Sequence, residues 1–200
     1  MGRTSLAAER RRHIVQVTID CISTHGIRGA TLERIAESAG MTRGHIRHYA
    51  GNRDELLTDA ARVFYFGEQA IDEKDARLAS NAGPLLDPAM SLDDALAYIF
   101  GEFIAPNSEN PAAIAFLDAS RTMPSIREIV LRAYSGISES LTEVIARAYP
   151  HATHEAVRRA SHGIVALGLG LFLYNEIEIS EQVVADARSI ADDLISTLDR

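Results

Sequence analysis

Two arginines and two histidines lie within a six-residue stretch of this 200-residue chain. They are Arg43, His45, Arg47 and His48, and Gly44 lies among them. Their nitrogen atoms can donate hydrogen bonds to phosphate oxygens or base edges, and a glycine lets the backbone approach such a ligand closely. The spacing of His45 and His48 also suits a metal pair, but no cysteine or acidic residue nearby completes a tetrahedral set. The stretch therefore predicts an anion-binding surface and no metal site.

The charge of the chain is divided unevenly along its length. Residues 1–53 carry nine arginines against four acidic residues, a net charge of +5. The remainder carries 11 basic and 24 acidic residues, a net charge of −13, and the whole chain has a formal charge of −8. Such asymmetry is typical of a polyanion-facing segment joined to an acidic body. A basic patch can equally be a solvated face, so charge alone leaves both interpretations open.

Patterns that mark catalytic or cofactor sites are missing from the sequence. It has no G-x-S-x-G elbow, no phosphate loop and no H-E-x-x-H, and the G-L-G at 168–170 lacks the third glycine and the preceding strand of a dinucleotide site. The single cysteine, Cys21, offers neither a disulfide framework nor a plausible nucleophile. We therefore predict no catalytic residue, no cofactor and no enzyme activity.

Two short helices must position the basic stretch. Thr31 has the side chain of an N-cap for a helix over 31–39, and Thr42 has that of an N-cap for a helix over 42–49. Gly40 lies between them, and glycine tolerates the left-handed backbone that a tight turn requires. The pattern predicts a helix-turn-helix, although two capped helices around a glycine also occur in other helical proteins.

Helical periodicity dominates the rest of the chain, without a convincing alternating strand pattern. We predict an all-α fold of about nine helices. Besides the short pair, the helices are expected over 5–24, from 54 to about 71, from 91 to 106, from Pro111, from Pro124 to about 149, from 153 to about 176 and from 180 to the end, with a loop or broken helix at 72–90. No apolar run approaches the ~20 residues that span a bilayer, and the N-terminus lacks a secretory signal. We therefore expect a cytoplasmic protein with no membrane partner.

Two runs of sequence go beyond these general patterns. The first is TLERIAESAGMT at 31–42, preceded by Ile14 and Gly26, and the second is GHIRHYAGNRDELL at 44–57. Together they resemble the DNA-binding region of the tetracycline-repressor (TetR) family, with its Thr-Val-x-x-Ile-Ala-x-x-Ala-Gly-Val-Ser and Gly-x-x-x-His-Tyr-Phe-x-x-Lys-x-x-Leu-Leu patterns. The chain departs from these patterns by the residues Ala50, Arg53 and Thr18, which replace phenylalanine, lysine and alanine.

The resemblance implies an architecture and a function. A three-helix helix-turn-helix domain is expected over 1–53, and an effector-binding and dimerisation domain over 54–200, with the helix that starts near residue 54 linking them. The implied function is a transcriptional regulator, most simply a repressor, that binds a palindromic operator in double-stranded DNA as a homodimer. An unknown small-molecule effector would release it.

The resemblance also implies the residues that contact DNA. Side chains expected to clamp phosphates are Thr31, Thr42, Tyr49 and Arg53. Residues expected to face the major groove are Arg43, Gly44, His45, Arg47 and His48. Tyr49 can alternatively pack against a neighbouring helix, and the arginines at 10–12 form either a phosphate-seeking arm or a solvated run.

The C-terminal helices are expected to form the dimer interface. The run at 163–174 is apolar around much of its circumference, so it must be covered on several sides. The interface residues implied are Gly163, Leu167, Gly170, Tyr174, Val184 and Ile190. The alternative is that this helix is wholly buried within its own subunit.

The middle helices are expected to enclose the effector. The residues proposed to line its pocket are Phe66, Tyr98, Glu102, Phe103, Phe116, Arg121, Tyr134 and His162. Each apolar member can alternatively be plain core. Two other functions also remain open: a non-catalytic helical module that binds acidic partners, and, less favoured, an enzyme.

Overall fold

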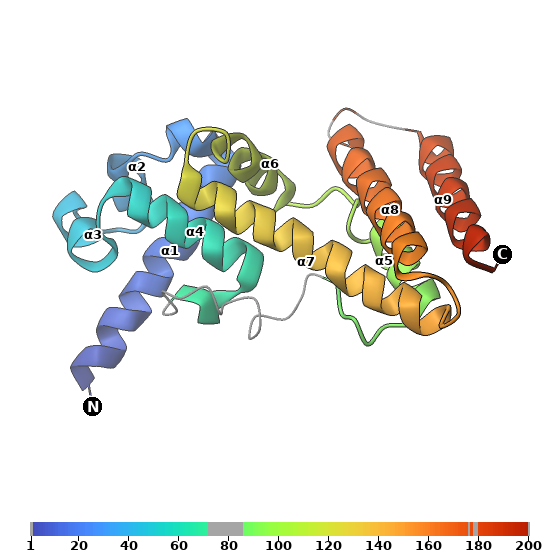
Figure 1. Cartoon of the computed structure of the whole chain (residues 1–200). Coiled ribbons are helices and arrows are strands. Elements are labelled where there is room, and N and C mark those ends of the chain that lie inside the picture. Colours follow the sequence, from blue (N-terminus) through green and yellow to red (C-terminus); the bar gives the residue numbers. More distant parts are fainter. Residues whose placement is uncertain (1, 72–85, 176, 178–179, 200) are drawn as a thin grey trace. The chain divides into compact units, whose positions relative to one another are not determined.

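The computed structural model of the chain describes residues 2–71, 86–175, 177 and 180–199. These residues form helices, turns and loops, and no strand occurs among them. The described part contains nine α-helices, labelled α1 to α9 (Figure 1). The prediction of an all-α fold is therefore confirmed. Most of the loop expected at 72–90 lies outside the described residues.

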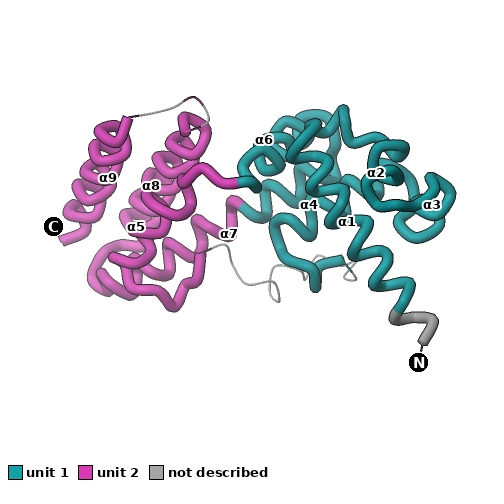
Figure 2. The backbone as a smooth tube through the Cα atoms, turned by 180° about the vertical axis from the view of Figure 1, so that it is seen from behind, with its two compact units in different colours: residues 1–82, 108–133 teal, residues 83–107, 134–200 magenta. Residues whose placement is uncertain are grey.

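The helices gather into two compact units, coloured differently in Figure 2. Unit 1 lies within residues 1–82 and 108–133, and unit 2 lies within residues 83–107 and 134–200. The predicted domain boundary after residue 53 does not coincide with a boundary between these two units. It separates a predicted DNA-binding part from a predicted effector-binding part, and it stays a prediction.

Unit 1 is built around its first helix. Its elements are α1 (Gly2–Gly29), α2 (Leu32–Ser38), α3 (Arg43–Ala50), α4 (Arg53–Phe66), a 3-10 turn at Glu68–Ile71, α6 (Asn110–Ala119) and the first part of α7 (Pro124–Ala148). α1 contacts α2, α3, α4 and α6. The core includes the fully buried side chains of Ile14, Ile22, Ile35, Ile46 and Leu57. Each such side chain contributes roughly 1.5–3 kcal/mol relative to an exposed one, so this core holds the small helices in place.

Most helices begin where their capping residues predict. The hydroxyls of Thr31, Thr42 and Thr153 each accept a hydrogen bond of 3.2 Å from the backbone N–H three residues later. Asn52 and Glu55 form a capping box at the start of α4, which places the two acidic residues of its first turn at the positive end of the helix. These bonds satisfy N–H groups that the helix itself leaves unpaired.

Three helix ends differ from prediction. The first helix continues past Gly26 to Gly29, and Gly26, at φ 66°, forms a kink instead of the end. α4 ends at Phe66 rather than near 71, because Gly67 turns the chain and donates to the carbonyl of Val63. The helix expected to reach residue 106 ends at Phe100, and a Cβ at Gly101 would lie 2.7 Å from the carbonyl oxygen of Ala97.

Unit 2 packs its helices around α8. It contains α5 (Leu92–Phe100), the rest of α7, α8 (His154–Asn175), α9 (Glu181–Ser196) and a 3-10 turn at Thr197–Asp199. α8 contacts α5 and α9. A Cβ on Gly168 would lie 2.7 Å from a side-chain carbon of Ile99 on α5, and one on Gly163 would lie 3.0 Å from Leu194 on α9. These two glycines therefore serve close helix packing within one chain.

One described helix passes a test of length and composition for crossing a membrane. It is α8, and 44% of its most apolar window is buried inside the structure. A helix in the core of a soluble protein passes the same test, so this finding carries little weight for a membrane role.

The turn before α3 generates a stability prediction. Gly40 has a φ of 63°, and nothing lies within 4 Å of a Cβ built on it, so the only cost of Gly40→Ala is that of the left-handed backbone. We expect the free energy of unfolding to fall by about 1–2 kcal/mol in urea titrations. Gly136→Ala is the control, because this helical glycine also has open space around it. It should raise stability by about 0.5–1 kcal/mol. Equal effects at both positions would contradict this account.

Candidate nucleic-acid interface

The turn between α2 and α3 is tight and is closed by backbone hydrogen bonds. The backbone N–H of Met41 donates to the carbonyl of Ala36 at 2.9 Å, and that of Gly40 donates to Glu37 at 3.1 Å. Ile35 of α2 and Ile46 of α3 have no exposed surface, so the two helices share a small apolar core. The predicted helix-turn-helix is therefore present in the structure.

α3 presents its polar residues to solvent. Of its eight residues only Ile46 and Ala50 are buried. The predicted major-groove residues are all exposed, namely Arg43, Gly44, His45, Arg47 and His48. A Cβ on Gly44 would meet nothing nearer than 3.8 Å, which leaves an open patch of backbone on this face. The exposed face of the helix thus carries hydrogen-bond donor side chains, with accessible backbone at Gly44 among them.

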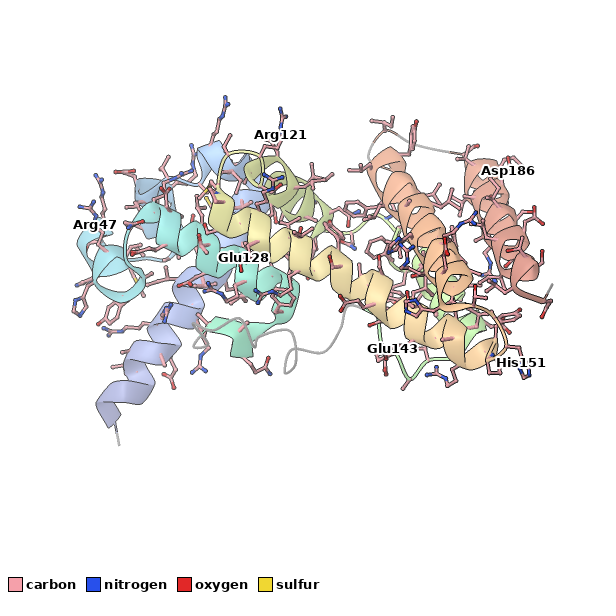
Figure 3. All side chains as sticks on the ribbon, in the orientation of Figure 1. Arg47, Arg121, Glu128, Glu143, His151 and Asp186 are labelled. Carbon is pink, nitrogen blue, oxygen red and sulfur yellow. The ribbon has the colours of Figure 1, made fainter. Side chains whose placement is uncertain are left out.

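The two arginines of α3 differ in their surroundings. Arg43 forms an ion pair of 2.7 Å with Glu33 of α2, and both side chains are more than half exposed. The pKa of Glu33 lies below its ordinary value because its carboxylate accepts its own backbone N–H and lies beside Arg43. Arg47 projects from α3 (Figure 3) without an ion pair to any side chain that the structure describes. Its donors are available to an external acceptor.

Tyr49 lies between two elements rather than free in solvent. Its hydroxyl accepts a hydrogen bond from Arg10 of α1, whose guanidinium carbon is 5.3 Å from the centre of the tyrosine ring. The ring also meets His48 edge-on at 4.8 Å. The half-buried ring packs as the alternative interpretation proposed, while its hydroxyl end remains next to the basic face.

Arg53 is committed in part to the protein itself. Its Nε donates to the carbonyl of Ala30 at 2.9 Å, and its Nη2 donates to the carbonyl of Ile27. It thereby ties the start of α4 to the segment that joins α1 and α2. The remaining nitrogen lies 3.9 Å from Asp54, and about a third of the side chain is exposed. The predicted contact of Arg53 with a phosphate stays a prediction, now beside a positioning role.

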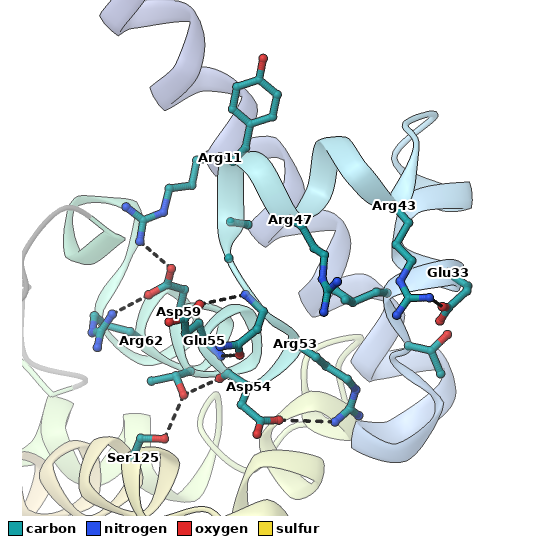
Figure 4. A pocket seen from close by; sticks show the side chains of 17 residues that line it. Arg11, Glu33, Arg43, Arg47, Arg53, Asp54, Glu55, Asp59, Arg62 and Ser125 are labelled. Atoms are coloured by element: carbon teal, nitrogen blue, oxygen red, sulfur yellow. Dashed lines mark hydrogen bonds and ion pairs between the residues drawn. The ribbon is translucent and has the colours of Figure 1, made fainter.

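A groove of about 1100 Å³ opens beside these residues within unit 1 (Figure 4). It is lined by Thr31, Arg43, Arg47, Tyr49 and Arg53 from the predicted set. The other four predicted residues are exposed but do not line it, namely Thr42, Gly44, His45 and His48. The structure therefore brings most of the predicted phosphate clamps to one groove and places most of the predicted base readers outside it.

The groove also contains charged residues that sequence reasoning missed. Asp59 of α4 is buried, and its carboxylate accepts from Arg11 at 2.6 Å and from Arg62 at 2.7 Å. The pair with Arg11 joins α4 to α1 and stabilises their mutual position. The spacing of Asp59 and Arg62 on one helix is a local signal of such a pair. No local signal marks Arg11, which lies 48 residues away in the chain.

The predicted effector residues are divided between the two units. Phe66, Phe116 and Arg121 belong to unit 1, and the other five belong to unit 2. Phe116 is fully buried, with its ring 5.4 Å from that of Phe64, as expected of plain core. Arg121 is 80% exposed and lies 3.6 Å from Asp118. The proposed roles of these three residues stay predictions.

In unit 2, part of the predicted set clusters. The rings of Tyr98 and Phe103 are 6.2 Å apart, and the ring of Phe172 is 5.9 Å from that of Phe103. Burial raises the pKa of Tyr98, and the charge of Glu102 raises it further. The other two residues lie apart: Tyr134 is half-buried on α7, and His162 lines a polar groove between α7 and α8.

The predicted dimer residues lie on α8 and α9. Tyr174 and Ile190 are 57% and 49% exposed, whereas Leu167 and Val184 are half-buried. Gly163 packs against α9 of its own subunit, and nothing lies within 4 Å of a Cβ on Gly170. Sequence reasoning did not select the neighbouring Leu173 and Ile177, which are also exposed. Both the packing and the association interpretations of this helix thus have residues in their favour.

Comparison with known proteins agrees with this geometry. Residues 14–60 match the model of a family described as bacterial regulatory proteins, tetR family. The HTH-type transcriptional regulator BetI of Paraburkholderia phytofirmans is 28% identical over 199 residues, covering 98% of this chain and 96% of the relative. BetI of Stenotrophomonas maltophilia is 26% identical over 194 residues, covering 96% and 93%.

Solved structures share the fold. A transcriptional regulator from Rhodococcus sp. Rha1 superimposes with a TM-score of 0.66 at 19% identity, covering 94% of this chain and 95% of the other. The multidrug binding protein EbrR, complexed with proflavin, superimposes with a TM-score of 0.61 at 21% identity, covering 92% and 99%.

The positioning role of Arg53 is testable by stability. Arg53→Ala removes the donor to two backbone carbonyls, and we expect the free energy of unfolding to fall by about 1–3 kcal/mol in urea titrations. Arg28→Ala is the control, because Arg28 is exposed near the same turn and its loss should cost less than about 0.5 kcal/mol. If the two variants unfold at the same urea concentration, Arg53 does not stabilise this turn.

Proposed function

Because this chain belongs to the TetR family of transcriptional regulators, we propose that it binds a palindromic operator in double-stranded DNA as a homodimer and represses transcription. The observation that carries the proposal is the exposed face of α3. Four donor side chains project from a capped helix that is held from behind by a small apolar core. Such a helix fits the major groove of B-DNA, which is about 12 Å wide.

Base recognition is assigned chiefly to Arg47. Its guanidinium has no ion pair to give up among the described residues, and arginine pairs with guanine O6 and N7 through two donors. Each such pair provides about 1–3 kcal/mol of discrimination between bases. Arg43 must exchange the exposed carboxylate of Glu33 for a DNA acceptor, which costs little in high dielectric.

Phosphate binding is assigned to the two helix N-termini and to the groove. Thr31, which lines the groove, and Thr42, which does not, begin helices whose N-terminal amides carry partial positive charge, a usual site for a phosphate. Tyr49, which also lines the groove, adds a hydroxyl at the other end of α3. Arg53 adds a guanidinium group, and one third of its side chain is exposed. These contacts orient α3 without reading sequence.

Dimerisation is assigned to α8, α9 and the segment between them. Five large apolar side chains are 43–71% exposed there: Leu173, Tyr174, Ile177, Val183 and Ile190. Exposed apolar side chains concentrated in one part of the chain are typical of an association surface. Two subunits related by a twofold axis also suit an operator whose half-sites lie about 34–36 Å apart.

Release by a small molecule completes the proposal. EbrR, a protein of the same fold, is complexed with proflavin, which supports a ligand-responsive chain. The aromatic cluster of Tyr98 and Phe103 in unit 2 is the candidate contact. An effector acts only if it binds the DNA-free conformer more tightly than the bound one. The proposal places this regulator in the cytoplasm and gives it no cofactor.

Sequence discrimination tests the DNA site. We would select bound duplexes from a random pool at physiological salt and then measure Arg47→Ala on the selected site and on a single-base mutant of it. The variant should stay folded but lose about 5-fold or more of the discrimination, as one base contact of ~1–3 kcal/mol implies. Arg121→Ala, at the α6–α7 turn away from α3 in Figure 3, is the charge-matched control. Unchanged discrimination by Arg47→Ala would favour a helical module that binds acidic partners generally.

Molecular mass in solution tests the dimer. Ile190→Glu places a charge in the proposed apolar interface and should shift the protein toward monomer in light-scattering measurements at micromolar concentration. Leu131→Glu is the matched control, because this leucine is 65% exposed on α7 and lies outside the proposed interface. A monomeric wild-type chain, or a dimer equally sensitive to both changes, would contradict the proposed interface.

A further inference from the structure

The first turns of α1 extend beyond the core of unit 1. The helix begins at Gly2, yet among the side chains described from Leu6 onward the first buried one is Ile14. Leu6 is 49% exposed, and no side chain from Leu6 to His13 is fully buried. Figures 1 and 2 both show this end of α1 on the side of unit 1 that carries α3. At 1.5 Å per residue, the stretch from 2 to 12 spans about 15 Å.

Three consecutive arginines in this stretch have different surroundings. Successive helical residues point about 100° apart, so the three side chains diverge. Arg10 lies on the ring of Tyr49, Arg11 pairs with the buried Asp59, and Arg12 is exposed with no ion pair to the described side chains. Arg11 is therefore a structural residue, whereas Arg10 and Arg12 retain donors for a ligand.

These cations do not serve the stability of α1. The N-terminus of a helix carries partial positive charge, so acidic residues are favoured there and basic ones are not. The first turn of α1 has no acidic residue, and Arg10 and Arg12 lie only two turns beyond it. A helix segment with few tertiary contacts also gains little from packing. The positive charge is therefore better explained by an external anion than by the fold.

We propose that the first turns of α1 are a second DNA-binding element, in which Arg10 and Arg12 contact backbone phosphates flanking the half-site that α3 occupies. The inference rests on the proposed function. DNA is favoured over an acidic protein because Arg10 bonds to Tyr49, at the end of the helix that is proposed to enter the major groove. We call residues 2–12 of α1 the arm. Duplex DNA carries one charge per about 1.7 Å of axis, so an arm about 15 Å long passes several phosphates.

The arm makes a distinct prediction about operator length. The unmodified 200-residue chain should bind an operator with flanking base pairs more tightly than one trimmed flush with its half-sites. The Arg10→Ala/Arg12→Ala variant should lose about 10-fold or more in affinity for the extended duplex and should bind both duplexes equally. Its sequence preference should not change, because phosphate contacts carry no base information.

Salt dependence measures how many phosphates the arm neutralises. In the double variant, the slope of log K against log salt should become shallower by about 0.9 for each phosphate released, or about 1.8 per subunit for two arginines. The Arg127→Ala/Arg159→Ala variant, with both residues exposed and outside α1 to α4, is the charge-matched control. It should retain the wild-type slope and the preference for the extended duplex.

The outcomes separate the arm from the motif. The single variant Arg12→Ala removes no hydrogen bond or ion pair among the described residues and leaves the bond between Arg10 and Tyr49 in place, so its effect does not arise from a displaced Tyr49. If the Arg10→Ala/Arg12→Ala variant and the Arg12→Ala variant both keep the wild-type slope and the preference for extended duplexes, the arm does not bind DNA. The same holds if affinity falls equally on flush and extended duplexes, because Arg10 then acts only by holding Tyr49. A wild type that selects no duplex at all overturns the proposed function together with the arm.

Discussion

α3 has eight residues, and only two of them bury their side chains. A helix this short is not stable by itself in water, and one that must keep its charged face open cannot gain stability by burying that face. The contacts that stabilise α3 must therefore come from its two ends and from its buried face. The N-cap at Thr42, the buried Ile46 and the contact of Tyr49 with α1 provide three such supports. The rest of unit 1 extends them inward.

Arginine has two kinds of role in this unit, and burial separates them. Arg53 and Arg11 turn inward, one to backbone carbonyls and the other to the carboxylate of Asp59, and both join elements that are distant in sequence. Arg47 and Arg12 remain in solvent. A partly buried guanidinium needs partners because desolvation is costly, whereas an exposed one keeps its donors for a ligand. One residue type thus supplies both the contacts that join the helices of this unit and exposed donors on its surface.

α8 meets a different pair of demands. Gly168 and Gly163 allow α5 and α9 to approach closely within one chain, while Tyr174 and Leu173 leave apolar surface in water. A helix that is apolar around much of its circumference can therefore pack inside its subunit along part of its length and associate along another. The two interpretations of its sequence concern different residues rather than excluding each other.

Local residue patterns are sufficient to place the starts of most helices and to identify the short helix that carries the basic face. Cap bonds join residues three apart, so Thr31, Thr42 and Thr153 act locally whatever the rest of the chain does. Only the packed fold brings together Arg53 with its backbone acceptors and Asp59 with Arg11, and only the fold distributes the predicted effector residues between two units. Those contacts join residues 23 to 48 positions apart, and such pairs exist only after packing has brought distant helices together.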